Sequence, residues 1–183
     1  MTMSKKLYAI GILFAVSAVG LGFFTVAAQG NGISDQQIEL IRSNCLSTKN
    51  TLNQLHASDA LLRVNRGQIY ESMSTKLMER FNGRVVGNGY NNSSLTAVAT
   101  GYGQALDTFR SDYKTYEEQL ASTISIDCSN RPSEFYDAVT SARTKRNQVH
   151  ADVIKLNQYV DQYQSAVDQF EKDYQVALQG VQQ

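Results

Sequence analysis

The stretch SIDCSNRP, residues 125–132, decides the fold that we predict for this chain. It places Cys128, one of two cysteines, four positions before Pro132, the only proline. Proline has no backbone N–H and suits the first turn of a helix, where that donor has no partner within the helix. The stretch therefore predicts a chain reversal, with one helix ending near residue 127 and the next beginning at Pro132.

The segment that follows Pro132 has the most regular helical pattern in the chain. Apolar or small residues, interrupted once by an arginine, recur at steps of three and four, and polar residues separate them. These positions are Phe135, Val139, Ala142, Arg146, Val149, Val153, Leu156, Val160, Tyr163, Val167, Phe170, Tyr174 and Ala177. The pattern predicts a long helix of coiled-coil type over residues 132–180.

Two further helices are predicted before the chain reversal. The first begins at Ser34, which with Gln37 has the spacing of a capping box, and its apolar pattern predicts a helix over residues 34–81. Residues 82–94, NGRVVGNGYNNSS, are rich in glycine and asparagine and are typical of a turn. A second pattern then runs from Leu95 to Ile124, which predicts a helix over residues 94–127.

Three amphipathic helices joined by two connections bury their apolar faces most simply against one another. The prediction for residues 29–183 is therefore an all-α domain, an elongated antiparallel three-helix bundle that resembles a coiled coil. Self-assembly of the third helix across chains, giving a homo-oligomer, is the alternative.

The two cysteines are predicted to form a disulfide. The stretch of chain from Cys45 to Phe81, before the glycine-rich turn, is almost as long as the stretch from Ser94 to Cys128 after it. Because every residue of an α-helix adds the same rise, both sulfur atoms should lie at nearly the same level of an antiparallel bundle. A Cys45–Cys128 bond would join the end of the bundle away from the turn, and two buried free thiols are the alternative.

The same counting predicts two pairs of buried charges. Asp59 follows Cys45 at the same spacing at which Arg146 follows Pro132. Arg66 is likewise as far along the chain from Cys45 as Asp107 is from Cys128. We therefore expect Asp59 to pair with Arg146 and Arg66 to pair with Asp107. The alternative is that each charge is solvated, with the arginine stems reaching out to water.

Residues 1–28 differ from the rest of the chain. Two lysines precede the uncharged run at residues 7–28, which is long enough to cross a membrane as a helix. The lysines place the N-terminus in the cytoplasm and residues 29–183 outside it. Either this segment remains as a membrane anchor, or it is a signal peptide that is cleaved after Ala28 and releases the domain. Export would also place the cysteines where disulfides persist.

Composition and motifs exclude several functions. The chain has 17 basic and 17 acidic residues, so it lacks the excess positive charge of a nucleic-acid-binding protein. It has two histidines and none of the motifs that mark hydrolases, metalloproteases or nucleotide-binding loops. Carboxylates such as Asp152 fall on polar helix faces, which suggests a solvated surface. We therefore expect no catalytic residues, no metal and no cofactor.

Two functions remain as expectations. The first is a structural or interaction module that contacts a protein or another component of the cell envelope. Phe170, Tyr174 and Ala177 extend the third apolar pattern beyond the level of the turn, where they form either an interaction surface or a frayed terminus. The second is a ligand-sensing bundle. A pocket near Arg66, Asp107 and His150 would favour sensing, whereas a packed interior with an exposed apolar patch near Phe170 would favour interaction.

Overall fold

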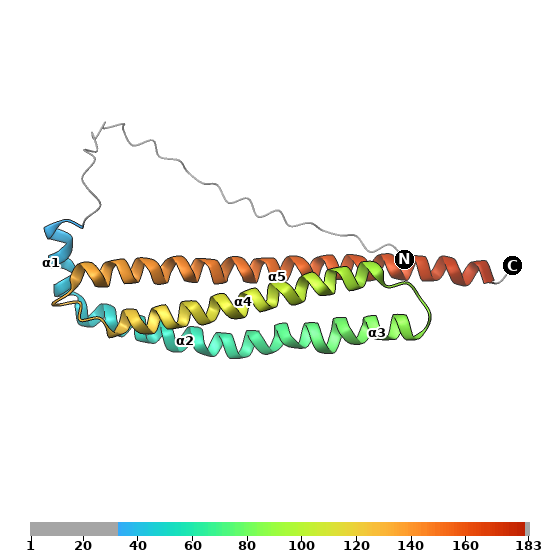
Figure 1. Ribbon diagram of the computed structural model, residues 1–183, viewed down its shortest axis with the longest axis horizontal. Helices are drawn as coiled ribbons and strands as arrows, with labels where there is room; N and C mark the ends of the chain where they lie inside the picture. The colour runs from blue at the N-terminus through green and yellow to red at the C-terminus, as the bar shows by residue number, and fades with distance from the viewer. Residues whose placement is uncertain (1–32, 182–183) are drawn as a thin grey trace, which may run out of the picture. The chain divides into compact units, whose positions relative to one another are not determined.

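The computed structural model describes residues 33–181, and its regular secondary structure in that range is helical, with no β-strand. The elements are α1 (Asp35–Ser43), α2 (Cys45–Ser72), the π-helix η1 (Met73–Met78), α3 (Glu79–Gly87), α4 (Ser93–Ser125) and α5 (Pro132–Val181). α1 to α3 form one arm, and α4 and α5 form two more. The arms lie side by side and successive arms run in opposite directions, which makes a helical bundle (Figure 1).

The first arm is not the single continuous helix that the sequence predicts. Its capping box is confirmed, because the Gln37 backbone N–H donates to the Ser34 hydroxyl at 3.3 Å and Gln37 Oε1 accepts from the Ser34 N–H at 2.9 Å. However, α1 ends at Ser43, and the backbone of the next residue, Asn44, leaves the helical region at φ −103° and ψ 7°. The Asn44 side chain donates to the Leu40 carbonyl at 2.9 Å, and such local bonds compete with helix continuation.

A second irregularity in the first arm is η1. A π-helical turn contains more residues than an α-helical turn, so it rotates the residues that follow. Met78 is consequently buried at 1% exposure while its neighbour Leu77 is 53% exposed. The rotation keeps Met78, Asn82 and Val85 on the buried side of the arm. It also places Tyr163 Oη 2.6 Å from Asn82 Oδ1, to which it donates a hydrogen bond.

The turn between the first two arms is shorter than predicted. α3 continues to Gly87 rather than ending near Phe81, because Val85 is buried in the same core cluster as Leu95 of α4. The connection is then only residues 88–92, and Gly89 adopts a φ of 78°, a conformation that glycine reaches without steric cost. Tertiary burial therefore outweighs the low helix propensity of the glycines in this stretch.

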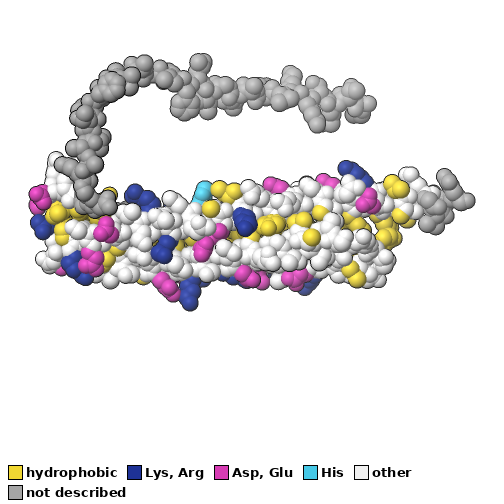
Figure 2. All heavy atoms as spheres, turned by 45° about the horizontal axis from the view of Figure 1, so that its top comes forward, with side chains coloured by type: hydrophobic (Ala, Val, Ile, Leu, Met, Phe, Trp, Pro, Cys, Tyr) yellow, Lys and Arg dark blue, Asp and Glu magenta, His cyan; other side chains and the backbone are white. Residues whose placement is uncertain are grey.

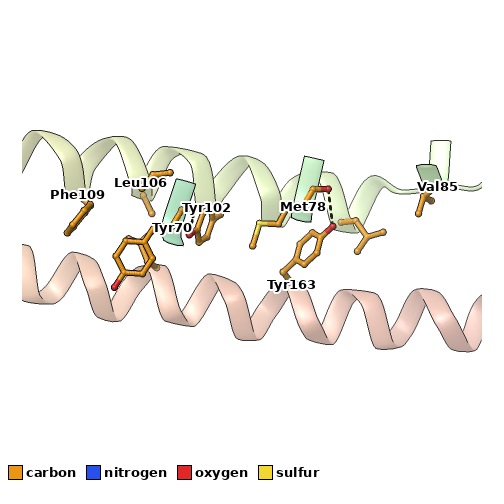
Figure 3. Packing of buried hydrophobic residues seen from close by; sticks show 10 residues of the cluster. Tyr70, Met78, Val85, Tyr102, Leu106, Phe109 and Tyr163 are labelled. Atoms are coloured by element: carbon orange, nitrogen blue, oxygen red, sulfur yellow. Dashed lines mark hydrogen bonds between the residues drawn. The ribbon is translucent and has the colours of Figure 1, made fainter. Parts of the chain in front are cut away.

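The core lies mainly along α4 and α5, which pack against each other over their shared length. The buried residues of α4 follow the predicted pattern closely and are Leu95, Tyr102, Ala105, Leu106, Phe109, Tyr113, Tyr116, Leu120 and Thr123. Two buried tyrosine hydroxyls find backbone partners in the first arm: Tyr102 Oη donates to the Tyr70 carbonyl at 2.9 Å, and Tyr163 Oη lies 3.2 Å from the Met78 carbonyl (Figure 3). These bonds connect the first arm to both of the others.

The end of the bundle opposite the turn is held by a disulfide. Cys45, the first residue of α2, is bonded to Cys128 in the connection between α4 and α5, with the two Cα atoms 5.5 Å apart. Nearby, Lys49 Nζ donates to the Ile126 carbonyl at 3.2 Å and Arg42 Nε donates to the Ser129 carbonyl at 3.3 Å. The pairing of the two cysteines is thus the one that their spacing predicts.

The predicted membrane or signal segment at residues 1–28, with its cleavage site after Ala28, lies outside the described residues. Within residues 33–181, none of the helices combines the length and the apolar character needed to cross a membrane.

Candidate functional site

An open groove of about 610 Å³ lies between α2, α4 and α5. It forms because α2 packs against α4 and leaves a gap towards α5. The lining residues are Asp59, Leu62, Arg63, Arg66 and Tyr70 of α2, Phe109 and Tyr113 of α4, and Arg146, Asn147, Val149, His150, Val153 and Asn157 of α5. Leu62 and Ile69 both fit the apolar spacing of the first predicted helix, but the structure leaves them 51% and 50% exposed, and Leu62 lines this groove.

An ion pair closes the end of the groove that is nearer the disulfide. Arg146 donates from Nε to Asp59 Oδ2 at 2.9 Å and from Nη2 to Oδ1 at 3.2 Å. Tyr116 Oη donates to Asp59 Oδ2 at 2.7 Å. One residue from each arm thus meets at this level, and the structure brings together the Asp59 and Arg146 that the sequence pairs. Only the acid is buried, since the Arg146 side chain is 51% exposed.

The Asp59 carboxylate is ionised in this setting. Burial by itself opposes the charge, but the hydrogen bonds from Arg146 and Tyr116 and the positive charge of Arg146 outweigh it. The pKa of Asp59 is therefore below its ordinary value. The hydrogen bond to Asp59 likewise raises the pKa of Arg146. At neutral pH the two groups neutralise each other, so neither contributes a free charge to the groove.

The floor of the groove is aromatic. Tyr70 and Phe109 meet edge to face with ring centroids 5.5 Å apart, and Phe109 and Tyr113 are 6.2 Å apart. All three rings are buried, and Figure 3 shows the first two between the helices. Burial raises the pKa of Tyr113 to about 12, so its hydroxyl remains protonated at neutral pH. The floor is thus a buried aromatic surface with no negative charge of its own.

Two arginines in the groove differ from Arg146. The Arg63 guanidinium carbon lies 5.3 Å from the ring centroid of Tyr113, within the range of a cation–π contact. Arg66 is exposed and lines the same wall. Among residues 33–181, no carboxylate forms an ion pair with either of them. The groove therefore carries positive charge that the described part of the chain does not neutralise.

The predicted pair of Arg66 and Asp107 is wrong. The Asp107 side chain is 76% exposed and pairs with Arg110 at 2.8 Å on its own helix, and Arg110 also pairs with Glu71. Counting residues gives the level of a side chain along the bundle, but it does not give the direction in which the side chain points. Neither Arg66 nor Asp107 is a buried charge, and only Arg66 belongs to the groove.

The predicted surface at Phe170, Tyr174 and Ala177 is partly covered. Tyr90 in the connection before α4 contacts the rings of Phe170 and Tyr174 at centroid distances of 6.1 and 5.2 Å, and Phe81 contacts Phe170 at 6.0 Å. Phe170 and Tyr174 are therefore half-buried, whereas Ala177 is exposed. The sequence pattern places Tyr90 in a turn and gives no sign that its ring covers this apolar surface.

Asp152 of α5 is not on a solvated surface, contrary to the expectation from sequence. Its residue exposure is 5%, and one carboxylate oxygen, Oδ2, is buried without a hydrogen-bond partner. Gln148 Nε2 donates to the other oxygen at 3.3 Å. Burial raises the pKa of Asp152, and the negative charge of Asp112 on α4 raises it further. This carboxylate is a cost to the fold when it is ionised.

The candidate site residues that the sequence pattern does not reveal are those of the groove, above all Arg63, Tyr70 and Tyr113. Arg63 and Tyr70 fall outside the apolar pattern that predicts the first helix, and Tyr113 has ordinary core spacing.

Within residues 33–181, no three His, Cys, Asp or Glu side chains gather as a metal site requires. Comparison with protein-family models, curated proteins and solved structures found no match for this chain. Its function is therefore inferred from the groove.

Proposed function

We propose that residues 33–181 form a non-enzymatic binding module whose ligand occupies the groove between α2 and α5. The observation that carries this proposal is the groove itself. Its volume of about 610 Å³ falls in the range of small-molecule sites, roughly 300–1,000 Å³, and such sites combine apolar walls with a few polar groups. Its lining includes Arg66 and His150, two of the three residues near which a pocket favours a ligand-sensing bundle, whereas the third, Asp107, does not line it.

The position of the groove suits a module that responds to its ligand. Its walls come from two different arms, α2 and α5, and among its lining residues the hydrogen-bonded bridge between these walls is Asp59 with Arg146. A ligand that contacts both walls would add to this bridge and stabilise α2 against α5. Binding would therefore raise the free energy of unfolding, and more so at higher ligand concentration.

A thermal-shift screen of small molecules tests the proposal, using the chain as the cell processes it. Asn157→Trp places a large ring at the mouth of the groove, and Gln158→Trp places the same ring on the neighbouring exposed position, which does not line it. We expect compounds that raise the melting temperature of the wild type and of Gln158→Trp but not of Asn157→Trp. Native mass spectrometry of the purified chain should show whether such a compound accompanies it from the cell.

The result that counts against the proposal is equally specific. If every stabilising compound acts on Asn157→Trp as strongly as on the wild type, the groove is not the binding site. The same conclusion follows if no compound stabilises the wild type and none accompanies it from the cell.

The second candidate is the structural or interaction module. It is supported by large apolar side chains that are exposed on α2, namely Leu61, Leu62, Val64 and Ile69. Figure 2 shows hydrophobic side chains in a band along one face of the bundle, with charged side chains on either side of it. The occupant we consider is a second copy of the chain. Sedimentation of the wild type and of the double variant Leu61→Gln/Ile69→Gln tests this candidate. A dimer of the wild type that is lost in the variant supports self-association. A monomeric wild type excludes self-association.

We also propose that the module works outside the cytoplasm, delivered by residues 1–28. The apolar run at residues 7–28 and the Cys45–Cys128 disulfide support export, since disulfides persist in oxidising compartments. Amino-terminal sequencing after cell fractionation distinguishes the two forms. Chains that begin at Gln29 in a soluble fraction would indicate a cleaved signal peptide, and intact chains in the membrane fraction would indicate an anchor.

A further inference from the structure

We infer that the groove between α2 and α5 binds an amphipathic organic anion, meaning a free acid with one negatively charged group on a single apolar chain or ring system. This inference rests on the proposed function, because it names the ligand class of the same groove. It is carried by the charges and the apolar surfaces that line the groove. Neither feature by itself is sufficient, since the floor alone would accept any apolar molecule.

The charges select an anion. Three arginines line the groove but only one carboxylate does, and that carboxylate, Asp59, is already bonded to Arg146 and Tyr116. Arg63 and Arg66 have no carboxylate partner in the described range. A guanidinium group can donate two parallel hydrogen bonds to one carboxylate or phosphate group, so arginines are suitable partners for an acid group. A cationic ligand would meet two unneutralised positive charges.

The apolar surfaces select the rest of the ligand. Behind the arginines lie the rings of Tyr70, Phe109 and Tyr113, and the α5 wall adds Val149 and Val153. The rings are only 4–6% exposed, so the apolar surface that a ligand can remove from water is mainly that of Leu62, which is 51% exposed, and of the two half-buried valines, at about 25 cal/mol for each Å². A small inorganic anion could pair with the arginines but would leave these aliphatic side chains uncovered. The surface therefore favours an acid with an apolar body.

The dimensions of the groove limit the size of that body. The lining residues run from position 59 to 70 on α2 and from 146 to 157 on α5. At about 1.5 Å of rise per residue, each wall is roughly 16 Å long. A single extended chain the length of decanoate fits within such a wall together with its acid group. A two-chain phospholipid would have most of its bulk outside the groove.

Titration of the intact chain with four probes tests the inference. The probes are decanoate below its micelle concentration, decan-1-ol as its neutral analogue, decylammonium as its cationic analogue, and acetate as an anion without an apolar body. Binding is measured by calorimetry, and the site is identified from the NMR signals of the Tyr70 and Tyr113 rings. We expect decanoate to bind most tightly and to shift both ring signals, with at least about a tenfold preference over each of the other probes.

A matched pair of variants assigns the charge selection to the groove. Arg66→Gln removes a groove arginine, and Arg143→Gln removes an exposed arginine of α5 that does not line it. Both positions are exposed, so neither substitution should prevent folding. We expect Arg66→Gln to weaken decanoate binding by about tenfold or more, in line with the loss of a hydrogen bond to a charged group, and Arg143→Gln to leave it unchanged.

The outcomes separate the inference from the proposed function. If decan-1-ol or decylammonium binds as tightly as decanoate, or if the two variants bind decanoate equally, the ligand class is wrong while a ligand site remains. If decanoate fails to bind, the inference fails, and the proposed function is then decided by the thermal-shift comparison of Asn157→Trp with Gln158→Trp. A fifth probe is vesicles of phosphatidylglycerol. If the vesicles bind in an Arg66-dependent manner and decanoate does not bind, the anion belongs to a membrane lipid rather than to a free acid. That result would overturn the inference.

Discussion

Asp59 in α2 and Arg146 in α5 are joined by two hydrogen bonds of 2.9 and 3.2 Å across a separation of 87 residues. The pair connects the first and third arms at the end of the groove, where α2 and α5 otherwise make little contact. Tyr116 adds a third bond from α4, so that a single carboxylate serves all three arms. Substitution of Asp59 is therefore the most direct test of how the three arms are held together.

Replacing Asp59 with alanine should lower the free energy of unfolding. The loss lies between the value of about 1 kcal/mol for an exposed ion pair and that of about 3–5 kcal/mol for a fully buried one, because Arg146 remains half exposed. Asp107→Ala, at an exposed acid on α4, is the control and should change stability by less than about 0.5 kcal/mol. Urea unfolding measures both. Equal effects of the two substitutions would show that the Asp59 pair does not stabilise the bundle.

The Asp59 effect should depend on pH in a defined direction. Its pKa is lowered in the folded state, so its contribution is fully present above the ordinary pKa of 3.8 and is lost as the pH falls through the lower, folded value. The difference in stability between the wild type and Asp59→Asn should therefore be constant near neutrality and shrink in acid. A difference that grows as the pH falls below the ordinary pKa would contradict the assigned direction of the shift.

Asp152→Asn should have the opposite sign and stabilise the bundle at neutral pH. The pKa of Asp152 is raised, with Asp112 adding to the effect of burial and Gln148 and Lys155 opposing it. The folded state therefore holds this proton more tightly than the unfolded state, and stability falls as the pH rises from the ordinary pKa through the folded one. The gain from Asp152→Asn should be largest above that window and should vanish below about pH 3.8. Urea unfolding at a series of pH values measures it, and a loss of stability at neutral pH would contradict it.

Removal of the disulfide should destabilise the chain without changing its helical fold. The bond closes a loop with a sequence separation of 83 residues, and an entropic treatment gives about 4.5 kcal/mol as the upper value for a loop of this size. The double variant Cys45→Ser/Cys128→Ser should unfold at lower urea concentration with a similar far-ultraviolet circular dichroism spectrum. Mass spectrometry of non-reduced peptides checks the linkage directly, and two alkylatable thiols in the native protein would refute it.

Gly101 and Gly103 of α4 allow the cost of a packing clash to be compared with the gain in helix propensity. A Cβ added at Gly103 meets no atom within 4 Å, so Gly103→Ala should gain about 1 kcal/mol of helix propensity. A Cβ added at Gly101 would lie 2.6 Å from Tyr159 Cε1, which forces the ring to move. Both substitutions gain the same helix propensity, so Gly101→Ala should be less stable than Gly103→Ala by the cost of moving the Tyr159 ring. Equal melting temperatures for the two variants would show that the Tyr159 ring yields freely.

The levels of residues along the arms were predictable because they depend on a local quantity, the rise per residue of a helix. The first and third arms keep a nearly constant offset: Asp59 is hydrogen-bonded to Arg146, 87 residues further along the chain, and Met78 to Tyr163, 85 residues further along. The pairing of the cysteines follows from the first two arms, because the chain from Cys45 to Phe81 is almost as long as that from Ser94 to Cys128.

The directions of side chains around the arms were not predictable. The break at Asn44 and the π-helix from Met73 to Met78 each rotate part of the first arm, and neither has a strong sequence signal. Leu62 and Ile69, which follow the break at Asn44, are half exposed, and Asp107 on α4 points outward. The extension of α3 to Gly87 and the covering of Phe170 by Tyr90 also depend on contacts between distant parts of the chain.

The amino-acid sequence by itself thus determined the helical arms, their order and the residues that share a level, since each follows from spacing within a helix. Only the tertiary structure decided that α2 lies close to α4 and apart from α5. That choice depends on which side chains fill the space between three arms at once, and no local pattern contains it. The groove, with Arg63 and Arg66 above its aromatic floor, is the consequence.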